Sequence, residues 1–219
     1  MQDERAREIY ERGTDPTRVL ALSDGVFAII LTLLVLEIHV PELGAGQTLR
    51  QALREIRPSL TAFLISFVIV AIAWAGHRDI FALIRRTDRG IVWLNFLYLL
   101  PLSILPFGAA MLATYERDPT ALRIYGMILV AIVVTRLATW LYATSRTHIL
   151  VTPVDARARR AGVVLVALPG VAYLVGFAVA DTTPTLAIWI YALVPVLYFL
   201  TVWILRSSAP DSSVTEEFT

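Results

Sequence analysis

Long apolar runs separated by short polar segments dominate this chain. Each run is about 20 residues or longer, the length of helix needed to cross a bilayer core of roughly 30 Å. The pattern predicts six membrane-spanning helices, near Val19–Val40, Leu60–Ile84, Ile91–Thr114, Leu122–Ala143, Ala161–Ala180 and Leu186–Leu205. The ten-residue alternating segments of an outer-membrane barrel are absent. We therefore expect an all-α, polytopic membrane protein.

The connections between the runs are short except for the first. Pro41 is expected to end the first helix, because proline cannot continue a helix without losing a backbone hydrogen bond. A short helix is expected in the loop that follows, over residues 49–56. We divide the chain into a cytoplasmic N-terminal segment (1–17), a six-helix membrane domain (18–206) and a disordered polar tail (207–219).

Composition and charge fit this assignment. Hydrophobic residues make up 57% of the 219 positions, and the mean hydropathy is +0.68, more apolar than an ordinary soluble domain. All 19 basic residues are arginine, concentrated before the first run and after the second and fourth. The positive-inside rule makes that side, with both termini, cytoplasmic. Nucleic-acid binding is disfavoured, because these arginines lie in short loops without interleaved aromatic residues.

Several polar side chains interrupt the apolar runs. Asp24, His77 and Asn95 are expected at similar depth, near the cytoplasmic ends of the first three helices. Such groups persist in a membrane when they are paired, hydrated or functional. We expect them to bond with Ser23 and Trp74 in one network. This network either holds the three helices together or acts in gating or proton sensing through His77, since histidine changes charge near neutral pH.

Arg136 in the fourth run is a further charged residue inside the membrane. Glu37, a backbone carbonyl or the membrane interface through snorkelling are all possible partners for it. The chain has no cysteine, which excludes disulfides and thiolate chemistry. His39, His77 and His148 lack the spacing of metal ligands, so we expect no metal site and no cofactor.

One face of the first helix carries an apolar stripe. Ile29, Thr32, Leu33 and Leu36 follow the i, i+3, i+4, i+7 spacing of a helix face. At about 100° per residue, Asp24 lies roughly 140° away from Ile29, so it is expected to contact its own subunit. The spacing by itself is as typical of a lipid-facing or helix-packing surface as of a pore.

The start of the first helix resembles a known signature. Arg18, Leu22, Ser23 and Asp24 match the R-x-x-x-F-S-D motif of the transmembrane protein 175 potassium channel family, in particular its bacterial members. Leu22 stands where the family has Phe, which keeps an apolar contact but loses aromatic packing. The similarity continues through T-L-L-V-L-E-I and through Trp74, His77, Trp93-Leu94-Asn95 and Leu105-Pro106-Phe107.

The resemblance implies a homotetramer of six-span subunits in the bacterial plasma (inner) membrane, with potassium as the permeating ion. Four copies of the first helix would line a central pore without the T-V-G-Y-G filter, which this chain also lacks. The pore residues would be Ile29, Leu33 and Leu36, with Thr32 as a hydroxyl layer. From their expected depth in the membrane, we assign a structural or gating role to the polar network of Arg18, Ser23, Asp24, Trp74, His77 and Asn95.

We therefore interpret the chain as a passive, potassium-selective channel. The alternative is a proton-coupled secondary transporter that uses Asp24 and His77 as a relay. Carriers typically place polar groups at the bilayer midplane, where this first helix is aliphatic. An intramembrane enzyme is the weakest interpretation, because Ser23 and Asp24 lack a base on the same helix.

Overall fold

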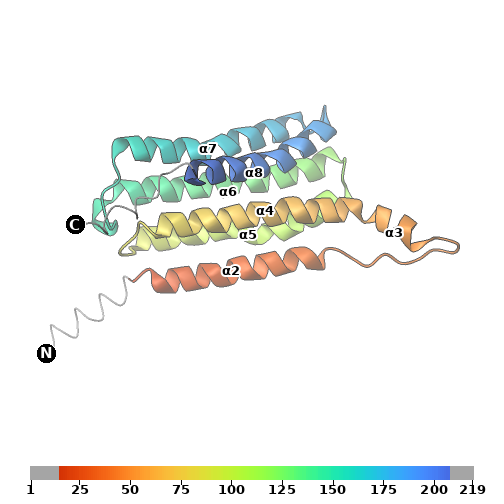
Figure 1. Ribbon diagram of the computed structural model, residues 1–219, viewed down its shortest axis with the longest axis horizontal. Helices are drawn as coiled ribbons and strands as arrows, with labels where there is room; N and C mark the ends of the chain where they lie inside the picture. The colour runs from red at the N-terminus through yellow and green to blue at the C-terminus, as the bar shows by residue number, and fades with distance from the viewer. Residues whose placement is uncertain (1–14, 208–219) are drawn as a thin grey trace, which may run out of the picture.

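The computed structural model describes residues 15–207 of the chain, and these are almost entirely helical. Figure 1 shows long helices lying side by side in one bundle. The elements are α2 (Thr17–Leu36), α3 (Leu49–Glu55), α4 (Arg57–Phe81), α5 (Arg89–Thr114), α6 (Pro119–Ser145), a 3₁₀ turn (Thr147–Ile149), α7 (Ala156–Val179) and α8 (Pro184–Ser207). The predicted N-terminal segment and C-terminal tail fall almost entirely outside the described residues.

The all-α prediction is confirmed. Five described helices, α2 and α4 to α7, are each long and apolar enough to cross a membrane. They coincide with the first five predicted runs to within a few residues at most ends. The sixth predicted run is also helical, as α8, and Pro184–Tyr198 is the apolar stretch of it whose side chains the structure describes.

The first helix ends earlier than predicted. α2 stops at Leu36, where Ile38 donates a backbone hydrogen bond to Val35 at 3.1 Å in a tight turn. Pro41 is therefore not the residue that ends it. Ile38, His39 and Val40, which precede the proline, are weaker helix formers than the leucines of α2. Glu37 is charged and lies at the edge of the apolar run. The short helix predicted over 49–56 is confirmed as α3.

The helices differ in how many of their residues are buried inside the subunit. In the most apolar stretch of α5 half of the residues are buried inside the subunit, whereas in that of α2 only 22% are. α2 lies at one side of the bundle and packs against α4 and α5 (Figure 1). Phe27, Ile30 and Leu34 join the core that includes Tyr98 and Leu102 of α5. α2 is thus attached to its own subunit by a single face.

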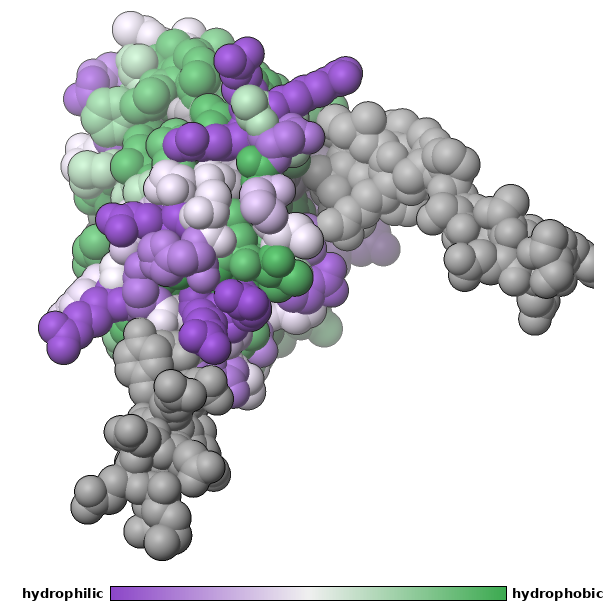
Figure 2. Space-filling model, turned by 90° about the vertical axis from the view of Figure 1, so that its left-hand side faces the viewer, coloured by the Kyte–Doolittle hydropathy of each residue, from purple (hydrophilic) through white to green (hydrophobic). Residues whose placement is uncertain are grey.

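One end of the bundle is strongly hydrophilic. Figure 2 looks onto this end, where the loops after α4 and α6 emerge and hydrophilic side chains gather. The exposed arginines in and beside these two loops include Arg85, Arg86, Arg89, Arg146, Arg157 and Arg160. The arginine-rich loops identified in the sequence therefore lie at the same end of the molecule.

Candidate functional site

The predicted stripe lies on the uncovered face of α2. Ile29, Leu33 and Leu36 are 58%, 41% and 68% exposed, and Thr32 is also exposed. On the other side of the same helix, Ile30 is 2% exposed. No other part of the described chain covers the stripe, so an extended apolar face is left for contact with something outside the subunit.

Thr32 adds an oxygen to this apolar face. Its Oγ1 donates a hydrogen bond to the carbonyl oxygen of Ile29, at 2.8 Å, one turn back on the same helix. The hydroxyl proton is therefore used within the helix. The lone pairs of the oxygen, which are the part that attracts a cation, remain available on the exposed face.

A buried hydrogen-bonded group joins α2, α4 and α5 near the hydrophilic end. Asn95 Nδ2 donates to Ser23 Oγ at 3.0 Å, and His77 Nε2 lies 2.8 Å from Asn95 Oδ1. Because the amide oxygen accepts this bond, Nε2 of His77 carries the proton. All three side chains are buried. One asparagine on α5 thus fixes both α2 and α4.

A second group lies beside the first but is exposed. Trp74 Nε1 donates to Asp24 Oδ1 at 2.9 Å, which ties α2 to α4 again. The Arg78 guanidinium lies 5.5 Å from the centre of the Trp74 ring. The predicted single network is therefore two bonded groups, Ser23–Asn95–His77 inside the subunit and Asp24–Trp74 at its surface. Asp24 contacts its own subunit, as its position on the helix predicted.

Arg18 belongs to neither group. Within residues 15–207 its side chain makes no hydrogen bond to them, and it instead lines a surface depression of about 380 Å³ together with Leu22 and Asn95. Arg18 therefore lies near Asn95, but it is not hydrogen-bonded to the network as predicted.

Aromatic rings that the sequence interpretation missed surround His77. The imidazole stacks on Phe81 with ring centres 4.4 Å apart and on Tyr98 at 5.8 Å, and Phe27 meets it edge-on at 5.7 Å. Each ring lies three or four positions along its helix from a member of the buried group, the spacing of side chains that share a helix face. This spacing in the sequence could have predicted that the rings lie beside the buried group. The rings shield the buried hydrogen bonds from water.

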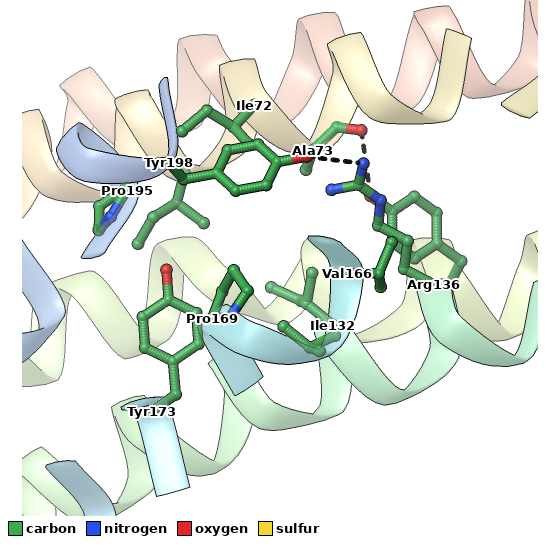
Figure 3. A pocket seen from close by; sticks show the side chains of 12 residues that line it. Ile72, Ala73, Ile132, Arg136, Val166, Pro169, Tyr173, Pro195 and Tyr198 are labelled. Atoms are coloured by element: carbon green, nitrogen blue, oxygen red, sulfur yellow. Dashed lines mark hydrogen bonds between the residues drawn. The ribbon is translucent and has the colours of Figure 1, made fainter. Parts of the chain in front are cut away.

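Arg136 finds a partner that the sequence did not indicate. Its Nη2 donates to the Tyr198 hydroxyl of α8 at 3.3 Å, and Figure 3 shows the two side chains pointing toward each other. Gly76 of α4 makes room for the guanidinium, since a Cβ at that position would collide with it. Among residues 15–207, neither Glu37 nor a backbone carbonyl bonds to Arg136. The described residues contain no cluster of His, Asp and Glu that could hold a metal ion.

Comparison with known proteins decides which family this arrangement belongs to. Residues 18–106 match the family described as endosomal/lysosomal potassium channel TMEM175, a range that contains the stripe and both bonded groups. A potassium channel from Streptomyces collinus is 38% identical over 176 residues, which cover 78% of this chain and 85% of that relative. The chain belongs to the TMEM175 family.

Other TMEM175 relatives extend the agreement to the whole bundle. A potassium channel from Chamaesiphon minutus is 38% identical over 143 residues, which cover 63% of this chain and 70% of the relative. A crystal structure of a lysosomal potassium-selective channel TMEM175 homolog from the same species matches with a TM-score of 0.75 and 32% identity. It covers 88% of this chain and 98% of that one. The fold is that of a TMEM175 channel, and the family is one of ion channels rather than enzymes.

Proposed function

We propose that four copies of this chain form a potassium-selective channel whose central pore is lined by α2. Each subunit crosses the plasma membrane six times, with α8 as the sixth span and both termini in the cytoplasm. The gathering of the arginine-rich loops at one end of the bundle supports this orientation (Figure 2). The potassium channel names of the bacterial relatives support the choice of ion.

The observation that carries the proposal is the exposure of the stripe on a helix anchored by its opposite face. Exposure of an apolar face would also fit a helix that packs against lipid. The hydroxyl oxygen of Thr32 within the stripe favours a pore over a lipid contact, because it can interact with a cation. Around a fourfold axis, Ile29, Leu33 and Leu36 form apolar rings and Thr32 a ring of oxygens. Apolar rings narrow enough to exclude water are a recognised way to close a pore.

Selectivity then follows from dehydration. The stripe offers one oxygen per subunit, too few to replace the full hydration shell of an ion. Potassium sheds water more readily than the smaller sodium ion, so the apolar rings hold sodium back more strongly. Potassium is the permeating ion, and no cofactor takes part.

The two bonded groups hold the pore helix in position. Ser23, Asn95 and His77 set the rotation of α2 about its axis from inside the subunit, and Asp24 with Trp74 sets it from the surface. The transporter alternative needs a proton relay between Asp24 and His77. In the described chain these residues bond to different partners, which favours a positioning role in gating over a relay.

Reversal potentials of purified protein in liposomes test the proposal. With potassium and sodium gradients opposed and no pH gradient, a potassium channel gives a sustained current that reverses near the potassium equilibrium potential. A flux that requires a proton gradient would instead establish the carrier. Native mass spectrometry of the same preparation is expected to give the mass of four chains.

A further inference from the structure

A cavity lies on the side of the subunit away from α2. It has a volume of about 360 Å³ and lies between α4, α6, α7 and α8. Its lining includes Gly76, Asp79, Arg136, Trp140, Leu165 and Tyr198. A narrower cavity of about 40 Å³, drawn in Figure 3, shares Arg136, Val166 and Tyr198 with it and is otherwise mainly apolar.

Arg136 brings a positive charge to this cavity without a negative partner. Within residues 15–207 its one hydrogen bond goes to the neutral Tyr198 hydroxyl, and its buried Nε has no partner. No described carboxylate forms an ion pair with it. An arginine within the membrane is costly unless its charge is matched by an anion or water. The cavity wall is therefore suited to a ligand with a negatively charged oxygen.

The order of groups along α4 narrows the chemistry of that ligand. Asp79 lies near the hydrophilic end of the helix, and Gly76, against which the Arg136 guanidinium rests, lies about 4.5 Å deeper at 1.5 Å per residue. Ile72 of the apolar cavity lies about 6 Å deeper still. From the hydrophilic end inward, the wall thus presents a carboxylate, a guanidinium and then apolar side chains.

This order is complementary to an aminophospholipid. The headgroup of such a lipid presents an ammonium outermost, a phosphate next and acyl chains toward the membrane centre. Trp140 lines the same cavity, and tryptophan is enriched at the level of lipid headgroups. Basic pockets between membrane helices on the cytoplasmic side are known sites for lipid phosphates.

We propose that the cavity binds one aminophospholipid from the leaflet facing the arginine-rich loops. Arg136 binds its phosphate, Asp79 binds its ammonium, and the acyl chains follow the apolar walls of α4 and α7. Asp79 also lies 3.4 Å from Arg78 at the rim, so the ammonium joins an existing charged pair. The carboxylate disfavours lipids with a further negative charge. The proposal depends on the membrane topology and not on conduction.

Native mass spectrometry of the protein in defined lipid tests the site. With equal amounts of phosphatidylethanolamine and phosphatidylglycerol, we expect one phosphatidylethanolamine retained per chain. Arg136→Gln is expected to lower its occupancy about tenfold, the range of one lost charge-assisted hydrogen bond. Asp79→Asn is expected to keep lipid bound but remove the preference for phosphatidylethanolamine. Arg123→Gln is the matched control, because Arg123 pairs with Asp181 at the opposite end of the bundle.

Three results would overturn the proposal. Undiminished lipid retention in Arg136→Gln would exclude a phosphate site at that residue. Displacement of the lipid by inorganic phosphate would show that a free anion is the ligand. Equal retention of the two lipids by the unmodified chain would remove the role of Asp79. Leu165→Trp narrows the cavity without altering either charge, and it is expected to reduce lipid retention even if Arg136→Gln fails to fold.

Discussion

The two faces of α2 are held in different ways. One face carries Ser23, Phe27 and Leu34, is buried in the subunit and is tied by hydrogen bonds to α4 and α5. The other carries Ile29 and Leu33 and is exposed in the described chain. Apolar packing alone has no direction, whereas hydrogen bonds require defined geometry. The polar contacts therefore decide which apolar residues remain outward, and the stripe depends on them.

The largest effect is expected from removing the centre of the buried group. Asn95→Leu leaves His77 buried without its hydrogen-bond partner, whereas Ser23 keeps its bond to the Val19 carbonyl, so the free energy of unfolding should fall by about 2 kcal/mol. Thermal unfolding and tetramer yield measure it. Val35→Ala on the exposed side of α2 is the control, and equal midpoints for the two variants would show that the buried group does not anchor the helix.

A conduction variant addresses the opposite face. Leu33→Ala widens an apolar ring and should raise potassium flux about tenfold, which corresponds to a barrier lower by about 1.4 kcal/mol. The helix should remain intact because alanine is a strong helix former. Flux into liposomes is the measurement, with Val35→Ala as the control, because Val35 is also exposed on α2 but lies outside the stripe. Flux unchanged in Leu33→Ala would count against an apolar gate.

The exposed polar pair should matter less than the buried group. Trp74→Phe removes the donor to Asp24 and is expected to cost about 1 kcal/mol of stability or to shift the open probability correspondingly. Asp24→Asn keeps an acceptor oxygen and should cost less. The ratio of potassium to sodium permeability should stay nearly constant in both. A loss of selectivity with normal assembly would instead place Asp24 in the ion path.

The smallest effect is expected at Thr32. Thr32→Val keeps the shape of the side chain and removes only the hydroxyl, so the pore should conduct as before with a modest loss of potassium preference, roughly twofold, because one weak ligand oxygen is lost from each subunit. Bi-ionic reversal potentials measure this. An identical ratio in the two proteins would mean that the hydroxyl does not meet the ion.

Much of this architecture could be predicted from local sequence. The helices follow from runs of apolar residues, and the stripe follows from helical periodicity, because both depend on neighbours within a few positions. The contact between Ser23, Asn95 and His77 could be anticipated from matched depth. The end of α2 could not, because a backbone turn at Ile38 ends the helix before Pro41 is reached, and no residue there marks such a turn.

The remaining features depend on how each helix is rotated against the others. The separation of Asp24 and Trp74 from the buried group is set by side-chain direction across three helices. The Arg136 partner, Tyr198, is 62 residues away on α8, a pairing that depth alone cannot distinguish from several others. Such contacts are fixed by tertiary packing, which no local pattern encodes.

Cysteine accessibility in adjacent positions tests most directly whether the exposed face of α2 lines the pore. The chain has no native cysteine, so single substitutions are the only reactive thiols. Ile29 is 58% exposed and Ile30 only 2%. A charged, water-soluble thiol reagent should block the potassium current of Ile29→Cys and leave that of Ile30→Cys unchanged, and potassium should slow the block. Equal sensitivity of the two variants, or no modification of Ile29→Cys in a conducting channel, would contradict the account.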